Sequence, residues 1–144
     1  MIAIDANVLL RRVVDDDPEQ AARAKRLFDG TEAILIADIV LVEAVWTLRG
    51  KRYKATKKDI HTLVMSLLEE PNTVFEDKQV IWSALSDFSA ARPVETADGT
   101  KGADLADALI VNKAKRWARD RHCPYRGTYT FDQTALQIGG TKSP

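Results

Sequence analysis

Two acidic residues in the first third of the sequence stand where a carboxylate could take part in chemistry. Asp5 follows the apolar run 2–4, which has the composition of a buried strand. Glu43 lies in a stretch that is apolar nearly all round a helix, and Arg49 is too far along that helix to be its obvious partner. Because an unpaired carboxylate is unfavourable in a core, the position of Glu43 favours a function. For Asp5, a function and a cap on the following helix explain the position equally well.

Three further acids stand in the second half of the sequence. Asp104 and Asp107 are three residues apart near the start of an expected helix, so both project from one face of it. Asp132 follows a candidate strand and opens a short final helix. Each also has a structural interpretation, because Asp104 could complement the helix dipole and Asp132 could cap its helix. Taken singly, these acids do not decide between structure and function.

The elements that must position these acids favour an α/β fold. Short apolar strands are expected at residues 2–4, 33–36, 73–75 and 127–131. Helices are expected at residues 7–12, 18–28, 38–49, 56–69, 77–91 and 103–119. Residues 92–102, with one proline and two glycines, are expected to form a loop. Strands that alternate with helices indicate a parallel sheet covered on both faces, which binds ligands at the carboxyl ends of its strands.

Several carboxylates gathered at one sheet edge would repel one another unless a cation lay between them. Carboxylate and water oxygens are the ligands that Mg²⁺ and Mn²⁺ prefer. Cys123 is the only cysteine, and His61 and His122 have no partnered arrangement, so a zinc site is not expected. The sequence therefore predicts a site for Mg²⁺ (or Mn²⁺) formed by Asp5, Glu43, Asp104, Asp107 and Asp132.

Size and charge limit what else the chain could be. Its 144 residues fit one domain. Lys and Arg together number 21, as do Asp and Glu, and the resulting net charge of zero excludes a protein that coats nucleic acid through bulk positive charge. No apolar stretch approaches the length of a membrane span and the N-terminus has no basic leader, so we expect a cytoplasmic protein.

Because the net charge is zero, any contacts to a phosphate backbone would have to come from local groups of basic side chains. The densest basic run is 50–58, in which Tyr53 could stack on a base, although an ordinary solvated loop explains this run equally well. Arg11 and Arg12, close in sequence to Asp5, are the other candidates.

Four segments in sequence order are similar to the motifs of one nuclease family: IDANVLLR, ADIVLVEAVWTL, GADLADALIV and YTFDQTAL. They resemble the acidic motifs of PIN domain nucleases, and among these the VapC toxins of bacterial type II toxin–antitoxin systems. The resemblance runs from Ile2 to about Leu136. It implies a PIN-like three-layer sandwich, in which helices flank a short central parallel sheet of about four to five strands. A single PIN-like domain is expected over residues 1–138, with 139–144 as a flexible tail.

The resemblance also implies a site and an activity. The positions that match the family's catalytic acidic quartet are Asp5, Glu43, Asp107 and Asp132. Asp104 matches an additional acid of the VapC branch, and Asn7 and Thr130 match supporting polar residues. The implied protein is a Mg²⁺- or Mn²⁺-dependent endoribonuclease, a hydrolase that leaves 5′-phosphate and 3′-hydroxyl ends. Its implied partners are the RNA substrate, a small cognate VapB-like antitoxin and a second copy of the chain in a homodimer.

Two other interpretations remain open. A phosphatase of the haloacid dehalogenase type also places an aspartate after its first strand, but its second aspartate would fall at Asn7, which cannot act as a general acid. A PIN module without activity, kept for protein binding, is the non-enzymatic alternative. The loop at 92–102 is longer than the family pattern suggests, which affects the expected shape of the substrate groove.

Overall fold

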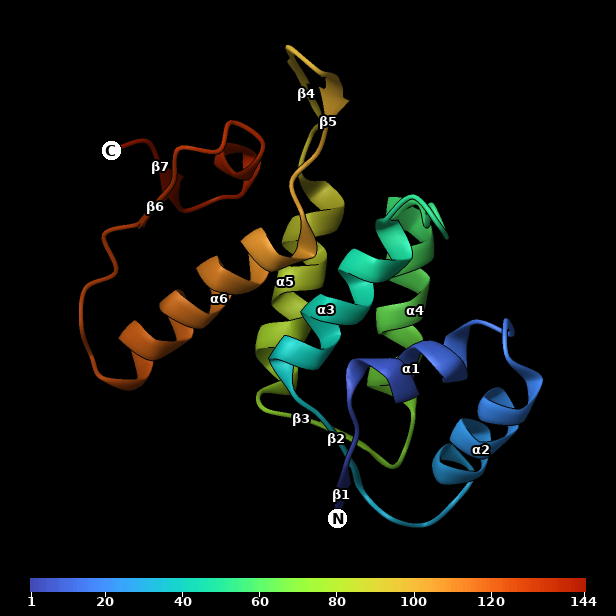
Figure 1. The fold of residues 1–144 in the computed structure, drawn as a ribbon. Helices are drawn as coiled ribbons and strands as arrows, with labels where there is room; N and C mark the ends of the chain where they lie inside the picture. Colours follow the sequence, from blue (N-terminus) through green and yellow to red (C-terminus); the bar gives the residue numbers. More distant parts are fainter. The chain divides into compact units, whose positions relative to one another are not determined.

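The computed structural model describes all 144 residues, which form two compact units, Met1–Lys78 and Gln79–Pro144 (Figure 1). The chain has an α/β architecture with six α-helices and short strands, most of which pair in parallel. The coarse fold class expected from the sequence is therefore confirmed. None of the six helices combines the length and the apolar character that a membrane span requires.

The first unit is built on a three-stranded parallel sheet. Its strands are β1 (Ile2–Ala3), β2 (Ile34–Ile36) and β3 (Thr73–Phe75), paired in the order β1-β2-β3. The central strand β2 is the most apolar, and Ile34 and Ile36 are fully buried. The sequence predicted all three strands, but the sheet of this unit has three strands and not the four to five that the resemblance implies.

Four helices accompany this sheet, and their starts follow from local capping. They are α1 (Ala6–Val13), α2 (Pro18–Phe28), α3 (Asp38–Arg49) and α4 (Lys57–Glu69). Asp17 accepts a hydrogen bond from the Gln20 N–H at the start of α2, and Thr56 and Asp59 form a capping box at the start of α4. Helix α1 packs against both α2 and α3, which places the residue after β1 beside helical side chains.

The second unit holds α5 (Lys78–Ala90), whose first residue ends the first unit, and α6 (Leu105–Asp120). Between them, the predicted loop 92–102 is wrong in part, because β4 (Val94–Thr96) and β5 (Gly99–Lys101) form an antiparallel hairpin there. The turn is possible because Gly99 adopts a positive φ of 103°. Fully buried Phe88 and Leu105 belong to the core of this unit.

The C-terminal segment carries two more short strands. These are β6 (Thr128–Tyr129) and β7 (Thr141–Lys142), which pair in parallel. Between them, the short helix predicted to open at Asp132 is a single 3₁₀ turn, η1 (Ala135–Gln137). Residues 139–144, where the sequence predicts a flexible tail, include β7, and the Thr128 N–H donates to the Gly140 carbonyl at 2.9 Å.

Candidate functional site

The two acids at the start of α6 are joined by a hydrogen bond. Asp104 is the N-cap residue of this helix, and its backbone N–H donates to Oδ2 of Asp107 at 2.8 Å. This contact brings the side chain of Asp107 back toward the first turn, as expected for an acid at the third helical position. Both side chains are half-buried. Their shared helix start is the feature that the sequence predicted from the three-residue spacing.

The surroundings of Asp107 shift the pKa of its carboxyl upward. Burial raises the pKa of the Asp107 carboxyl above its usual value, and the nearby carboxylates of Asp132 and Asp104 raise it further. The hydrogen bond from the Asp104 N–H acts in the opposite direction, but it does not cancel the rise. The influence of Asp132 shows that an acid from a later part of the sequence acts electrostatically on the two acids at the start of α6.

Asp132, whose charge acts on Asp107, has different surroundings. Its Oδ1 accepts hydrogen bonds from the Thr134 N–H at 2.7 Å and from the Thr134 hydroxyl at 2.8 Å. These bonds hold the pKa of the exposed Asp132 carboxyl below its usual value, and the charge of Lys101 contributes to the decrease. Thr130 supports the same turn, because its hydroxyl accepts the Asp132 N–H at 3.0 Å.

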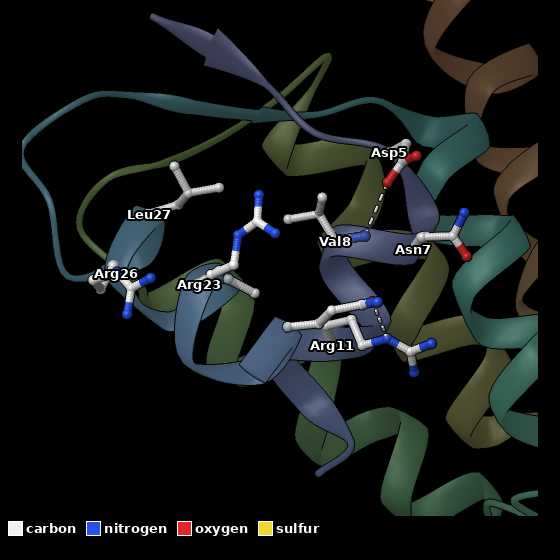
Figure 2. A pocket seen from close by; sticks show the side chains of 9 residues that line it. Asp5, Asn7, Val8, Arg11, Arg23, Arg26 and Leu27 are labelled. Atoms are coloured by element: carbon white, nitrogen blue, oxygen red, sulfur yellow. Dashed lines mark hydrogen bonds between the residues drawn. The ribbon is translucent and has the colours of Figure 1, made fainter. Parts of the chain in front are cut away.

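Asp5 lies in the first unit, at the end of β1. The side chain is exposed, not buried as the apolar run before it suggested, and its Oδ1 accepts the Val8 N–H at 2.9 Å (Figure 2). The capping role that the sequence left open for Asp5 is therefore present in the structure. Asn7, the predicted supporting residue, is also exposed on the first turn of α1.

A pocket of about 500 Å³ opens beside Asp5, between α1 and α2. It is lined by Asp5, Asn7, Val8, Arg11, Gln20, Arg23, Ala24, Arg26 and Leu27. The sequence analysis pointed to Arg11 but missed Arg23 and Arg26. The three-residue spacing of Arg23 and Arg26 indicates that both lie on one side of the helix. The spacing does not indicate that this helix, α2, packs against α1 and forms a pocket there.

Arg11 has a fixed position in this pocket. Its Nε donates to Oε1 of Gln20 at 2.8 Å, and its guanidinium also pairs with Asp16. Asp16 in turn accepts hydrogen bonds from Arg52 at 2.8 Å and from the Tyr53 hydroxyl at 2.6 Å. Tyr53, which the sequence suggested as a stacking residue, therefore has its hydroxyl engaged within the first unit.

Glu43 does not have the buried position that its apolar neighbours suggested. It is exposed on α3, and Ile39 and Trp46, one turn before and after it, are 68% and 55% exposed. The expectation of a buried acid is wrong because an apolar composition on all sides of a helix does not mean that every side is covered. This face of α3 carries one acid between two large apolar side chains.

Two acids that the sequence analysis did not select follow the other strands of the sheet. Asp38 lies two residues after the end of β2, is 8% exposed, and donates its backbone N–H to Oε1 of Glu76 at 3.0 Å. Glu76 itself follows β3. Ala37 is the N-cap residue of α3 and its side chain makes no capping hydrogen bond, so the Glu76 carboxylate satisfies an N–H of the first turn instead. The rule that ligands bind at the carboxyl ends of parallel strands was the signal for both residues.

The predicted site residues thus fall into two groups, each described within its own unit. Asp104, Asp107, Asp132 and Thr130 belong to the second unit, whereas Asp5, Asn7 and Glu43 belong to the first. Neither unit contains three or more His, Cys, Asp or Glu side chains arranged to hold a metal ion. No protein-family model and no curated protein matches the chain. What the site can do must therefore follow from its own residues.

Proposed function

We propose that this chain is a Mg²⁺- or Mn²⁺-dependent endoribonuclease with a PIN-like fold. The observation that carries the proposal is the group of Asp104, Asp107 and Asp132 around the start of α6. A half-buried carboxylate with two like charges nearby is unfavourable, and a divalent cation would remove that penalty. Such a cation would also let the anionic phosphate of a phosphodiester approach the acids, which would otherwise repel it, and would assist its hydrolysis.

The donor chemistry of this group fits Mg²⁺ and Mn²⁺, because every available atom is a hard oxygen. Mg²⁺ is commonly held by only one or two carboxylates, with water and substrate phosphate as its other ligands. Asp107 and Asp132 would be those two carboxylates, with Asp104 beside them. When bound, the ion would neutralise charge on the phosphate and make water a better nucleophile.

The residues of the group have different proton affinities, and these suit different roles. The raised pKa of Asp107 makes it the better proton acceptor, so Asp107 would orient the attacking water and take its proton. The lowered pKa of Asp132 keeps it ionised and therefore suited to hold a cation. Thr130 and Thr134 would keep the Asp132 carboxylate in place through the hydrogen bonds already described.

The remaining parts of the proposal rest on the sequence resemblance. Asp5 and Glu43 would complete the acidic quartet, with Asn7 supporting Asp5. The chain would act as the toxin of a toxin–antitoxin pair, as a homodimer inhibited by a small VapB-like antitoxin. The exposed face of α3 around Glu43 is a candidate surface for one of these protein contacts, since Ile39 and Trp46 are unusually exposed there.

A cleavage assay tests the ribonuclease proposal. The purified full chain is incubated with a mixed single-stranded RNA in Mg²⁺, in Mn²⁺ and in EDTA, and the product ends are determined. We expect cleavage only with metal, with 5′-phosphate and 3′-hydroxyl ends. Asp107→Asn should reduce the rate about 100-fold or more, the scale seen when one stabilising group of an active site is lost.

The matched control is Asp120→Asn, which removes the same charge from the far end of α6. Asp120 is exposed and pairs only with Arg116, one turn before it, at 3.0 Å. This variant should cleave RNA at the wild-type rate, and thermal unfolding should show that both variants are folded. Cleavage that persists in EDTA, or that falls equally in the two variants, would contradict the proposal.

A further inference from the structure

The walls of the pocket beside Asp5 are largely apolar. Val8 of α1 and Ala24 and Leu27 of α2 form these walls, and the volume of about 500 Å³ lies within the range of pockets that hold small ligands. Leu27 is 40% exposed, although its neighbour Ala24 is buried. Such walls suit a flat or weakly polar group, such as a nucleobase or a ribose face, better than a charged group.

Two guanidinium groups in this pocket have no partner. Arg23 and Arg26 make no hydrogen bond or ion pair, whereas Arg11 is held by Gln20 and Asp16. Figure 2 shows Arg23 extending from α2 toward Val8 on α1. The guanidinium group presents a planar fork of donors that matches phosphate oxygens, so two unpaired arginines beside an apolar wall favour a ligand with both an anionic and an apolar part.

We propose that this pocket binds one nucleotide of single-stranded RNA, with Arg23 and Arg26 on its phosphate and its base or ribose against Val8 and Leu27. The inference deepens the proposed ribonuclease function and rests on it: Asp5 lies on the rim of the pocket, so the bound nucleotide would position the chain of the substrate relative to this acid. Arg23 and Arg26 would be positioning residues, which bind substrate without taking part in the chemical step.

The observations favour RNA over an acidic peptide as the occupant. A glutamate or aspartate side chain would present a carboxylate to the arginines but no flat apolar surface to the walls of the pocket. A nucleotide supplies both within one residue of its chain, and arginine can contact its phosphate in a bidentate manner.

Binding can be measured separately from cleavage. Fluorescence anisotropy of a labelled eight-nucleotide RNA is recorded with the full chain in EDTA, at salt concentrations from 50 to 200 mM. The variants are Arg23→Gln, Arg26→Gln and the double variant. The matched control is Lys25→Gln, an exposed cation on the same helix that does not line the pocket.

The double variant should bind RNA about tenfold more weakly or worse at low salt. Each lost phosphate contact should also reduce the slope of log affinity against log salt by about 0.7. Lys25→Gln should stay within about twofold of wild type. In the cleavage assay, the arginine variants should raise KM and leave kcat unchanged, because they lose binding that ground state and transition state share.

Equal loss of affinity in Lys25→Gln and the arginine variants would overturn the proposal, since it would show only general electrostatic attraction. A glutamate-rich peptide that binds through Arg23 and Arg26 while RNA does not would overturn it in favour of a protein partner. Arginine-dependent RNA binding without cleavage in any metal would uphold the pocket and reject the nuclease. Metal-dependent cleavage together with RNA binding that does not depend on Arg23 and Arg26 would uphold the nuclease and reject the pocket.

Discussion

Asp5 and Asp107 have the same local role in different surroundings. Each accepts a backbone N–H at the start of a helix, Asp5 from Val8 at 2.9 Å and Asp107 from Asp104 at 2.8 Å. Asp5 is exposed and lines a pocket together with three arginines, whereas Asp107 is half-buried and is acted on by the charges of two other acids. If the proposed function holds, an acid that accepts a hydrogen bond at a helix start can also take part in chemistry. What separates the two carboxylates is the charge around them.

The largest expected difference between them is in metal affinity. Asp107→Asn should weaken Mn²⁺ binding about tenfold or more, because it removes the carboxylate that a cation would relieve most. Asp5→Asn should weaken it less, since Asp5 is exposed and shares its pocket with three arginines, whose charges disfavour a cation there. Mn²⁺ titration followed by electron paramagnetic resonance measures both affinities. An equal loss of Mn²⁺ affinity in the two variants would show that the surroundings of Asp5 and Asp107 do not affect metal binding differently.

A second prediction separates the capping role of Asp5 from any chemical role. Asp5→Asn keeps an N-cap acceptor, so its free energy of unfolding should stay near that of wild type, whereas Asp5→Ala should lose about 1 kcal/mol. RNA cleavage should fall in both variants, because neither retains the carboxylate. Urea unfolding and the cleavage assay together provide the test. Full cleavage activity in Asp5→Asn would show that Asp5 only caps α1 and has no chemical role.

A third prediction concerns Asp132, whose pKa is lowered mainly by hydrogen bonds from Thr134. Thr134→Val removes the hydroxyl that bonds Oδ1, so the pKa of Asp132 should rise toward its usual value. The free energy of unfolding should fall by about 1 kcal/mol. Thr141→Val is the control, because it removes a comparable hydroxyl bond to the Ile138 carbonyl. Carboxyl carbon NMR should show an unchanged Asp132 pKa in the control.

The smallest expected effect is on the pH dependence of stability. Because the folded-state pKa of Asp107 lies above its usual value of 3.8, this group supports folding fully below that value and loses its contribution as pH rises through the raised pKa. Asp132, with a lowered pKa, loses its contribution as pH falls below 3.8. Asp107→Asn should therefore lessen the fall in stability above pH 4, measured by urea unfolding without metal. An unchanged profile would contradict the assigned surroundings of Asp107.

The sequence predicted those parts of the fold that local chemistry determines. Helices α2 and α3 have the predicted bounds because Asp17 and Pro18 start the first and Gly50 ends the second. The hairpin at 94–101 was missed because its glycines were taken as signs of a loop, although a positive φ at Gly99 also serves a tight turn.

The candidate site was predictable only in part. The spacing of Asp104 and Asp107 predicted that they share one helix start, and the charge of Asp132 acts on Asp107. The predicted gathering of all five acids stays a prediction. The exposure of Glu43 and the pocket beside Arg23 depend on which helices pack together, which periodicity does not specify. Residues whose role comes from a neighbour far along the chain were therefore the ones that the sequence left undetermined.

The carboxylate of Asp16 has a consequence for the pocket under acid conditions. It binds Arg11 of α1 together with Arg52 and Tyr53 of the segment between α3 and α4, and so ties three stretches of chain to one point. The Tyr53 hydroxyl and the two arginines hold its pKa below the usual value. These contacts of Asp16 should therefore persist at a pH at which ordinary aspartates are already protonated. The wall of the pocket formed by α1, which carries Arg11, should then keep its shape in mildly acidic solution.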